Sequence, residues 1–214
     1  MIAAQNHNPT ILNPDFLVRN GIVSSDWKLA QPPVCVEPYA QVVYTNGISV
    51  VSDLGKMVFS QAGNSLTKEI VKVVEMARQY VNAVPHVDYR ELGINPKGDV
   101  EFKTEEESRQ YIMGKLIAHG PWQVYGKAPV RASTTFVFQL EKAKLFVTIQ
   151  EAKLKQSEGT SSSVVAFAAN FHYKLNWIAK EDMIKTFSDA LGEWQDCWME
   201  YVNLVSNIFN LKGM

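Results

Sequence analysis

The sequence has few cysteines, and its charges nearly balance. Only two cysteines occur in 214 residues, Cys35 and Cys197, and both have apolar neighbours. Because free cysteines in such contexts are typically buried thiols in reducing compartments, we expect a cytoplasmic protein. The 21 basic and 22 acidic residues leave a formal net charge of -1. Proteins that bind nucleic acid usually carry a basic excess, so we expect no nucleic-acid partner.

Long apolar stretches are absent as well. The longest runs, such as Val164–Ala169, fall far short of the roughly 20 residues that a membrane-spanning helix needs. The N-terminal residues show no basic region followed by an apolar one, as a secretory signal would. We therefore expect no membrane partner.

The short motifs of common enzyme sites are also missing. The chain has no Walker phosphate loop, no G-x-G-x-x-G, no H-E-x-x-H, no G-x-S-x-G and no C-x-x-C. These absences argue against nucleotide-binding, zincin and α/β-hydrolase functions, and they imply no metal and no cofactor. An enzyme whose site is assembled from scattered residues stays open, with its catalytic residues unknown.

The residues that are present indicate one α+β domain. An apolar fraction of 46% and a charged fraction of 20% are ordinary for a globular protein. Residues 1–33 are rich in Asn and Pro, and we expect an irregular segment there, packed on the body through side chains such as Phe16 and Trp27. We expect residues 34–214 to form a single domain, because no long linker divides them.

Period-two alternation in the first half predicts a strand at 34–44 that is interrupted near Pro38, and further strands at 48–52 and 56–61. Asn46-Gly47 between the first two is the strongest short signal of a hairpin, because both residues tolerate a positive φ. A helix is expected from about residue 65 to residue 84, where Pro85 ends it. These elements make up a β-β-β-α unit.

The second half repeats this plan. After a strand at 86–94 and a helix that begins at Thr104, alternation predicts strands at 130–140, 143–153 and 164–177, followed by the final helix. Residues 34–84 and 131–211 thus form a possible pseudo-repeat, although their residue identities do not match. We expect a mainly antiparallel sheet of about seven strands, because short links favour antiparallel pairing.

The C-terminal residues, from about Lys180 to Lys212, carry the most regular pattern in the chain. Large apolar residues recur there at spacings of three and four: Ile184, Phe187, Leu191, Trp194, Trp198, Tyr201, Val205 and Ile208. The spacing predicts one long helix packed on the sheet. The same stripe suits either packing on the protein's own sheet or a seam with a second subunit. We take Trp194, Trp198, Tyr201 and Val205 as candidate interface residues.

Two groups of polar residues are candidates for ligand binding. Asn170, His172 and Lys174 share one face of the predicted strand 164–177, where they could contact a polar ligand. His86 and Asp88 share a face of strand 86–94, and a His-x-Asp pair can bind a metal or relay protons. Two ligands do not make a metal site, and either row is also what a strand face exposed to water would show.

One stretch resembles known sequences. The run Tyr89–Asn95 (YRELGIN), which follows a helix ending at Val84-Pro85, resembles a segment of uncharacterised bacterial proteins of similar length. So does the early Pro32-Pro33 followed by strands. The resemblance implies a bacterial protein and carries over no activity, substrate or catalytic residue.

Together these features favour a non-enzymatic protein that binds protein, itself included, through the C-terminal helix, so that a homo-oligomer or another protein chain is the expected partner. The alternative is a small-molecule-binding protein or enzyme. Its cleft would lie on the sheet face near His172 and Asn170, or near His86 and Asp88.

Overall fold

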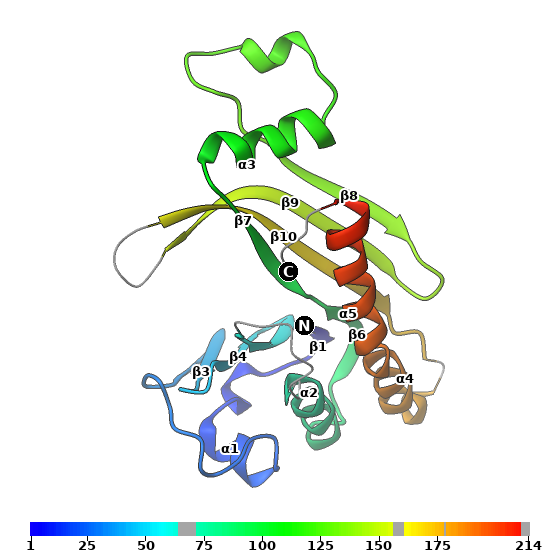
Figure 1. The fold of residues 1–214 in the computed structure, drawn as a ribbon. Coiled ribbons are helices and arrows are strands. Elements are labelled where there is room, and N and C mark those ends of the chain that lie inside the picture. The colour runs from blue at the N-terminus through cyan, green and yellow to red at the C-terminus, as the bar shows by residue number, and fades with distance from the viewer. Residues whose placement is uncertain (64–71, 156–160, 178, 211–214) are drawn as a thin grey trace. The chain divides into compact units, whose positions relative to one another are not determined.

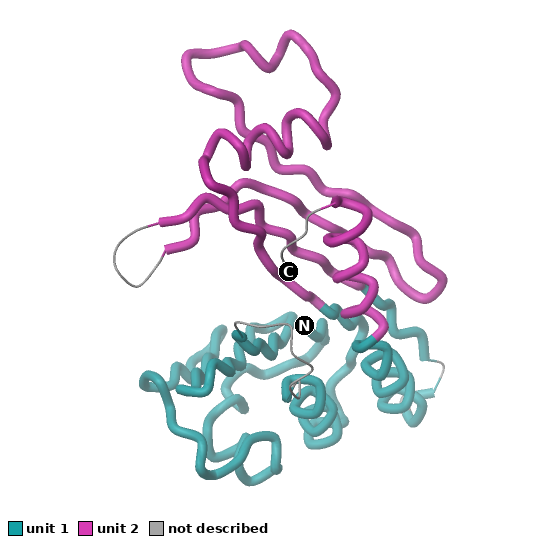
Figure 2. The backbone as a smooth tube through the Cα atoms, viewed as in Figure 1, with its two compact units in different colours: residues 1–94, 172–195 teal, residues 95–171, 196–214 magenta. Residues whose placement is uncertain are grey.

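The computed structural model describes residues 1–63, 72–155, 161–177 and 179–210 (Figure 1). Contacts divide the chain into two compact units, residues 1–94 with 172–195 and residues 95–171 with 196–214 (Figure 2). The boundary predicted at residue 34 and the possible pseudo-repeat of residues 34–84 and 131–211 stay predictions. The described residues show no pattern of two β-β-β-α units.

The described residues contain ten strands and nine helical segments. The strands are β1 (Ile2–Gln5), β2 (Val34–Val36), β3 (Tyr39–Val43), β4 (Ile48–Asp53), β5 (Lys56–Gln61), β6 (Asp88–Ile94), β7 (Lys97–Phe102), β8 (Ser133–Gln139), β9 (Lys144–Lys155) and β10 (Ser161–Lys174). The helical segments are η1 (Pro9–Ile11), α1 (Pro14–Arg19), α2 (Lys72–Ala83), α3 (Glu105–Tyr111), η2 (Ile112–Leu116), η3 (Pro121–Val124), α4 (Lys180–Gly192), α5 (Trp194–Asn203) and η4 (Leu204–Ile208).

The strands are hydrogen-bonded in the order β2-β3-β4-β5-β1-β6-β10-β9-β8, and β7 pairs with β10. The pairs whose register is defined are antiparallel. The mixed α+β class is confirmed, but the prediction of about seven strands is wrong. β1 lies in the segment for which we predicted irregular structure, and a turn at Glu37-Pro38 divides the first predicted strand into β2 and β3.

The first unit is built around the predicted hairpin. Val43 of β3 pairs with Ser49 of β4, and Gly47 in the connecting turn has a φ of 80°. A side chain at Gly47 would lie 3.2 Å from the carbonyl oxygen of Ala62, so glycine suits the position both for its backbone and for the space available.

Helix α2 provides the centre of the first unit's core. Tyr80 is fully buried, and its ring lies 5.8 Å from that of Phe59 on β5 and 6.0 Å from that of Phe16 on α1. The first part of the predicted helix 65–84 lies outside the described residues. From Lys72 to Ala83 the helix is confirmed, and its buried positions follow the helical period, because a single side of the helix contacts the core.

The second unit contains β7, β8, β9 and most of β10, together with α3 and most of α5. Thr104 caps α3 as predicted, since its Oγ1 accepts a hydrogen bond from the backbone N–H of Glu107 at 3.1 Å. The Tyr111 hydroxyl at the end of α3 donates to the carbonyl oxygen of Phe209 at 2.7 Å, and Phe209 contacts Phe167 of β10 at a ring distance of 5.8 Å. The end of α3 and the residue that follows η4 thus both contribute to the core of this unit.

The C-terminal helix is present but interrupted. The expected single helix is instead α4, α5 and the π-helical turn η4, with the break at Glu193. Gly192 ends α4, and a side chain there would meet nothing within 4 Å. Gly192 therefore marks the end of α4, and it has open space around it. The heptad pattern continues across the break because both helices bury the same kind of apolar side chain.

None of the helices in the described part of the chain is long and apolar enough to cross a membrane.

Candidate functional site

The three polar residues predicted to bind a ligand lie along β10. His172 is paired with a carboxylate, since its Nε2 lies 3.1 Å from Oε2 of Glu91 on β6. Lys174 is exposed, and Asn170, which belongs to the second unit, has a buried Oδ1 without a hydrogen-bond partner among the described residues. Neither hollow described below is lined by these residues, so the ligand site stays a prediction.

The role predicted for His86 and Asp88 stays a prediction. His86 is exposed and precedes β6, whereas Asp88 accepts a hydrogen bond from Nε of Arg90 at 2.8 Å. The Arg90 guanidinium stacks over the ring of Trp177 at 4.8 Å. Among the described residues no group of three or more His, Cys, Asp or Glu could hold a metal ion.

Two of the four candidate interface residues of the C-terminal helix are buried within the protein. Tyr201 and Val205 have no exposed surface, and the Tyr201 hydroxyl donates to the carbonyl oxygen of Phe167 at 3.1 Å. Trp194 and Trp198 are half-buried, whereas 60% of Met199 is exposed. A partner could therefore reach only part of the predicted stripe on α5.

A surface that the sequence analysis missed is the outer edge of β8, the last strand of the second unit's sheet (Figure 1). From Ala132 to Leu140 the sequence is ASTTFVFQL, without a charge and without a proline. Phe136 and Phe138 are half-buried, and 57% of Val137 is exposed. Strand edges expose unpaired backbone groups, and native proteins normally protect them with charges, prolines or short length.

The other strands with one free edge carry such protection. β2 has three residues and lies between Pro32-Pro33 and Pro38. β7 carries Lys97, Asp99 and Glu101. β8 is longer than β2 and has none of these features, so its edge is suited to pairing with another chain. The uncharged stretch is visible in the sequence, but the sequence does not reveal that this strand is last in the sheet.

A charged cluster in the second unit was also missed. Glu151 continues the inward row of β9 after Ile149, and only 6% of its side chain is exposed. Its Oε2 lies 3.3 Å from Nε of Arg131, and neither carboxylate oxygen accepts a hydrogen bond from a described residue. Burial raises the pKa of Glu151, while the positive charges of Arg131 and Arg109 act in the opposite direction.

Glu105 connects this cluster to the surface. It forms ion pairs with Arg131 and with Lys153, the latter at 3.0 Å, and the Lys153 ammonium lowers the pKa of Glu105. Arg109, which pairs with Glu106, completes the cluster. The cluster then contains three acidic and three basic side chains: Glu105, Glu106, Glu151, Arg109, Arg131 and Lys153. Because its positive and negative charges balance, we interpret this network as a structural contact between α3 and β9.

Two hollows lie beside the cluster. One of about 670 Å³ is lined by residues 101–105 and 161–163, and one of about 250 Å³ includes Glu106, Arg109 and Met113. Among the described residues that line the larger hollow, Phe102 alone has an apolar side chain. Small-molecule sites are usually lined by apolar side chains with a few polar groups, so neither hollow identifies a ligand.

The first unit contains a buried polar group around His7. Its Nε2 lies 2.6 Å from the Tyr80 hydroxyl, and its Nδ1 lies 3.1 Å from Oγ of Ser52 and 3.2 Å from the carbonyl oxygen of Asp53. All three side chains, His7, Ser52 and Tyr80, are buried. The group resembles a proton relay only in composition, because a nucleophile without access to solvent cannot meet a substrate. Its role is to satisfy polar atoms in the core.

We expect the free energy of unfolding to decrease as the pH is lowered below about 6.5. Burial lowers the pKa of His7 from its ordinary value of 6.5, Asp53 raises it, and His86 lowers it further. Above this pH His7 is neutral in the folded and the unfolded chain, so its contribution is fully present. Below it the unfolded chain binds a proton more readily, and stability is lost as the pH falls toward the folded pKa. Urea unfolding at a series of pH values measures this slope.

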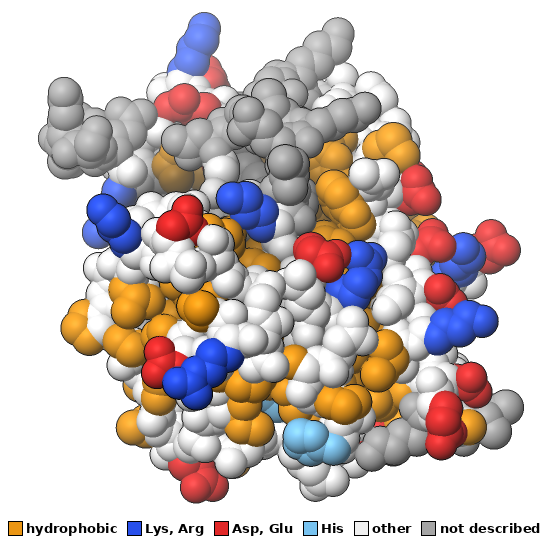
Figure 3. Space-filling model, turned by 90° about the horizontal axis from the view of Figure 1, so that it is seen from below, with side chains coloured by type: hydrophobic (Ala, Val, Ile, Leu, Met, Phe, Trp, Pro, Cys, Tyr) orange, Lys and Arg blue, Asp and Glu red, His pale blue; other side chains and the backbone are white. Residues whose placement is uncertain are grey.

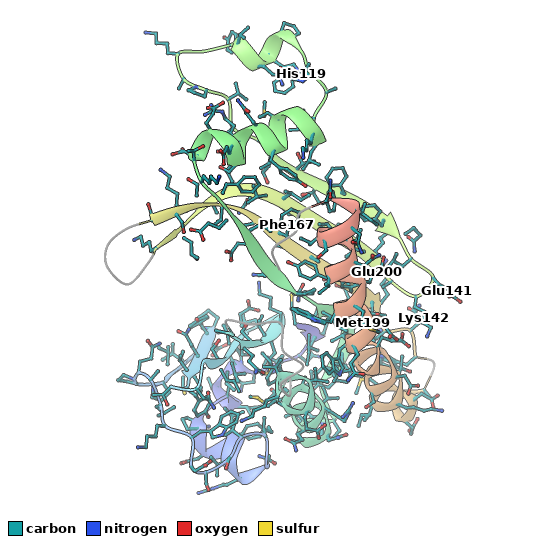
Figure 4. All side chains as sticks on the ribbon, viewed as in Figure 1. His119, Glu141, Lys142, Phe167, Met199 and Glu200 are labelled. Carbon is teal, nitrogen blue, oxygen red and sulfur yellow. The ribbon has the colours of Figure 1, made fainter. Side chains whose placement is uncertain are left out.

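His119 supplies a matched control, because it is exposed (Figure 4), and its Nδ1 lies 3.0 Å from Oε1 of Gln123. His7→Asn is expected to reduce the slope, and His119→Asn to leave it unchanged. Equal slopes for the wild type and His7→Asn would contradict this assignment.

Comparisons of the chain with family models, curated proteins and solved structures found no match.

Proposed function

We propose that this chain is a non-enzymatic protein that acts by binding protein, including a second copy of itself, through the second unit. The observation that carries the proposal is the unprotected, uncharged edge of β8. The C-terminal helix belongs to the same surface, because Phe209, just after η4, contacts Phe136 of β8 at a ring distance of 5.5 Å. Half-exposed aromatic side chains at a strand edge are typical of interface residues.

Two further observations support a protein partner. Ile208, next to Phe209, is 61% exposed, so exposed apolar surface occurs on both β8 and η4. On the face shown in Figure 3, basic and acidic side chains of the described residues are interspersed, and no area of that face is purely basic. Phosphate groups would require such an area. We keep the cytoplasm as the expected compartment, which the two free cysteines support.

Sedimentation equilibrium over a range of micromolar concentrations tests the proposal. We expect a mass above the 24.1 kDa of one chain that increases with concentration. A single species of 24.1 kDa at every concentration would contradict self-association.

A further inference from the structure

The backbone groups of β8 that face its free edge can be identified. The N–H of Leu140 donates to the carbonyl oxygen of Ala143 at 2.9 Å, across the turn that joins β8 to β9. Backbone groups of an antiparallel strand point alternately to either side. The even-numbered residues of β8 therefore bond to β9, and the odd-numbered ones, Ser133, Thr135, Val137 and Gln139, direct N–H and C=O toward the free edge.

The side chains agree with this assignment. Thr135 lies opposite Thr148, and their hydroxyl oxygens are 2.9 Å apart. Such close side-chain contact is typical of pairs that are not hydrogen-bonded through the backbone. Thr135 thus has its own backbone groups on the outer side of β8.

We propose that two copies of this chain pair through β8 as an antiparallel, two-fold symmetric dimer whose axis passes between the two Phe136 residues. The inference rests on the proposed function and names its partner and register. In this register Thr135 pairs with Val137 of the second copy, and Ser133 pairs with Gln139. Every outward N–H and C=O of these four residues then has a partner.

In the two neighbouring registers, residues of β8 pair with charged residues that lie outside the strand. An axis at Thr135 would place Gln139 opposite the charged Arg131 of the other copy, and an axis at Val137 would place Ser133 opposite Glu141. If the axis lay between two residues of β8, the outward N–H and C=O groups of one copy would face backbone groups of the other copy that already bond to β9. The uncharged length of β8 is therefore self-complementary in one register.

The proposed register also covers the exposed apolar side chains. A two-fold axis of an antiparallel pair is perpendicular to the sheet, so both copies present the same face on the same side. Phe136 and Phe138 share a face with Phe209, as the ring distance of 5.5 Å between Phe136 and Phe209 shows. In the dimer the aromatic side chains of both copies become adjacent on that face, and Val137 packs on the other.

A second copy is a better occupant of this edge than an unrelated strand. The odd-numbered groups match in number and spacing under two-fold symmetry, and the edge offers no charge that would select a different partner. The flanking Arg131 and Glu141 carry opposite charges, so an antiparallel copy places unlike charges near each other at both ends.

Disulfide cross-linking reads the register directly. Three variants that each add one cysteine, Thr135→Cys, Phe136→Cys and Val137→Cys, are oxidised in a Cys35→Ser background, in which the remaining native cysteine, Cys197, is buried. At the axis, two Cα atoms lie about 4.5 Å apart, within reach of a disulfide, whereas the flanking positions lie beyond about 7 Å. We expect covalent dimer from Phe136→Cys at a level at least tenfold above that of the other two.

The outcomes separate the inference from the proposed function. Cross-linking that is strongest at residue 135 or 137 overturns the register. A chain that sediments as a dimer but cross-links at none of the three positions associates through another surface, which overturns this inference and leaves the proposed function standing. A wild-type chain that stays monomeric overturns both.

Because Phe136→Cys removes a packed ring, a measurement on the unmodified chain completes the test. Amide hydrogen exchange resolved by residue is compared at low and high protein concentration. We expect at least tenfold slower exchange at high concentration for the amides of Thr135 and Val137, and no change for those of Thr134 and Phe136. Equal exchange at both concentrations for all four, in a chain shown to be a dimer, overturns the inference.

Discussion

Replacing Val137 by proline is expected to weaken self-association on the order of 100-fold without unfolding the protomer. The N–H of Val137 points away from β9, so its loss removes no bond within the chain, and proline is tolerated at an outward position of an edge strand. In the dimer the same change removes one hydrogen bond in each half of the interface and sets a proline ring against the partner strand. Sedimentation equilibrium measures the change in affinity, and the circular dichroism melt reports on the protomer.

Val137→Ala is the matched control. It keeps the N–H and removes only exposed apolar surface, so we expect a smaller loss of affinity than with proline. If both variants associate as strongly as the wild type, the edge of β8 is not the contact. If Val137→Pro unfolds, the direction assigned to the backbone groups of β8 is wrong.

Replacing Phe167 by alanine is expected to lower the free energy of unfolding by about 3–5 kcal/mol. The side chain is 1% exposed, and its ring contacts that of Phe209. Truncation removes apolar burial and leaves a cavity that rigid strands on either side cannot close. Chemical denaturation followed by tryptophan fluorescence gives the value.

Tyr201→Phe isolates the hydrogen bond that α5 makes with β10 from the ring contact between Phe209 and Phe167. It keeps the buried ring and loses only the hydrogen bond to the carbonyl oxygen of Phe167, so a loss of about 1 kcal/mol is expected. A loss below 1 kcal/mol for Phe167→Ala would contradict the packing of the C-terminal residues from α5 to Phe209 on this strand. It would then reopen Tyr201 and Val205 as surface residues.

Local signals in the sequence predicted local structure well. The hairpin at Asn46-Gly47 forms because its geometry depends on a few adjacent residues. The cap at Thr104 forms for the same reason. Alternation also located β8, β9 and β10, since a strand with one buried face must place apolar residues at every second position. The short strand β1 was missed because its four residues show too little periodicity.

The tertiary structure decided what those elements do. The sequence marked Trp194, Trp198, Tyr201 and Val205 as equally apolar, and the fold buried the last two completely while leaving the tryptophans half-exposed. The spacing predicted one helix, and the chain formed two helices and a π-helical turn. A periodic pattern of apolar residues predicts that one side of a helix is buried, but it does not predict which part of the protein buries it.

The same reasoning applies to the two features of the second unit that the sequence analysis missed. Glu151 could have been singled out, because it extends the inward row of β9, but its arginine neighbours come from residues far away in sequence. The uncharged run of β8 is visible in the sequence, yet only the order of the strands makes it an edge. The sequence by itself determined the elements and their apolar faces, because both depend on contacts between near neighbours. The tertiary structure alone decided which backbone groups were left without a partner, since that depends on where the sheet ends.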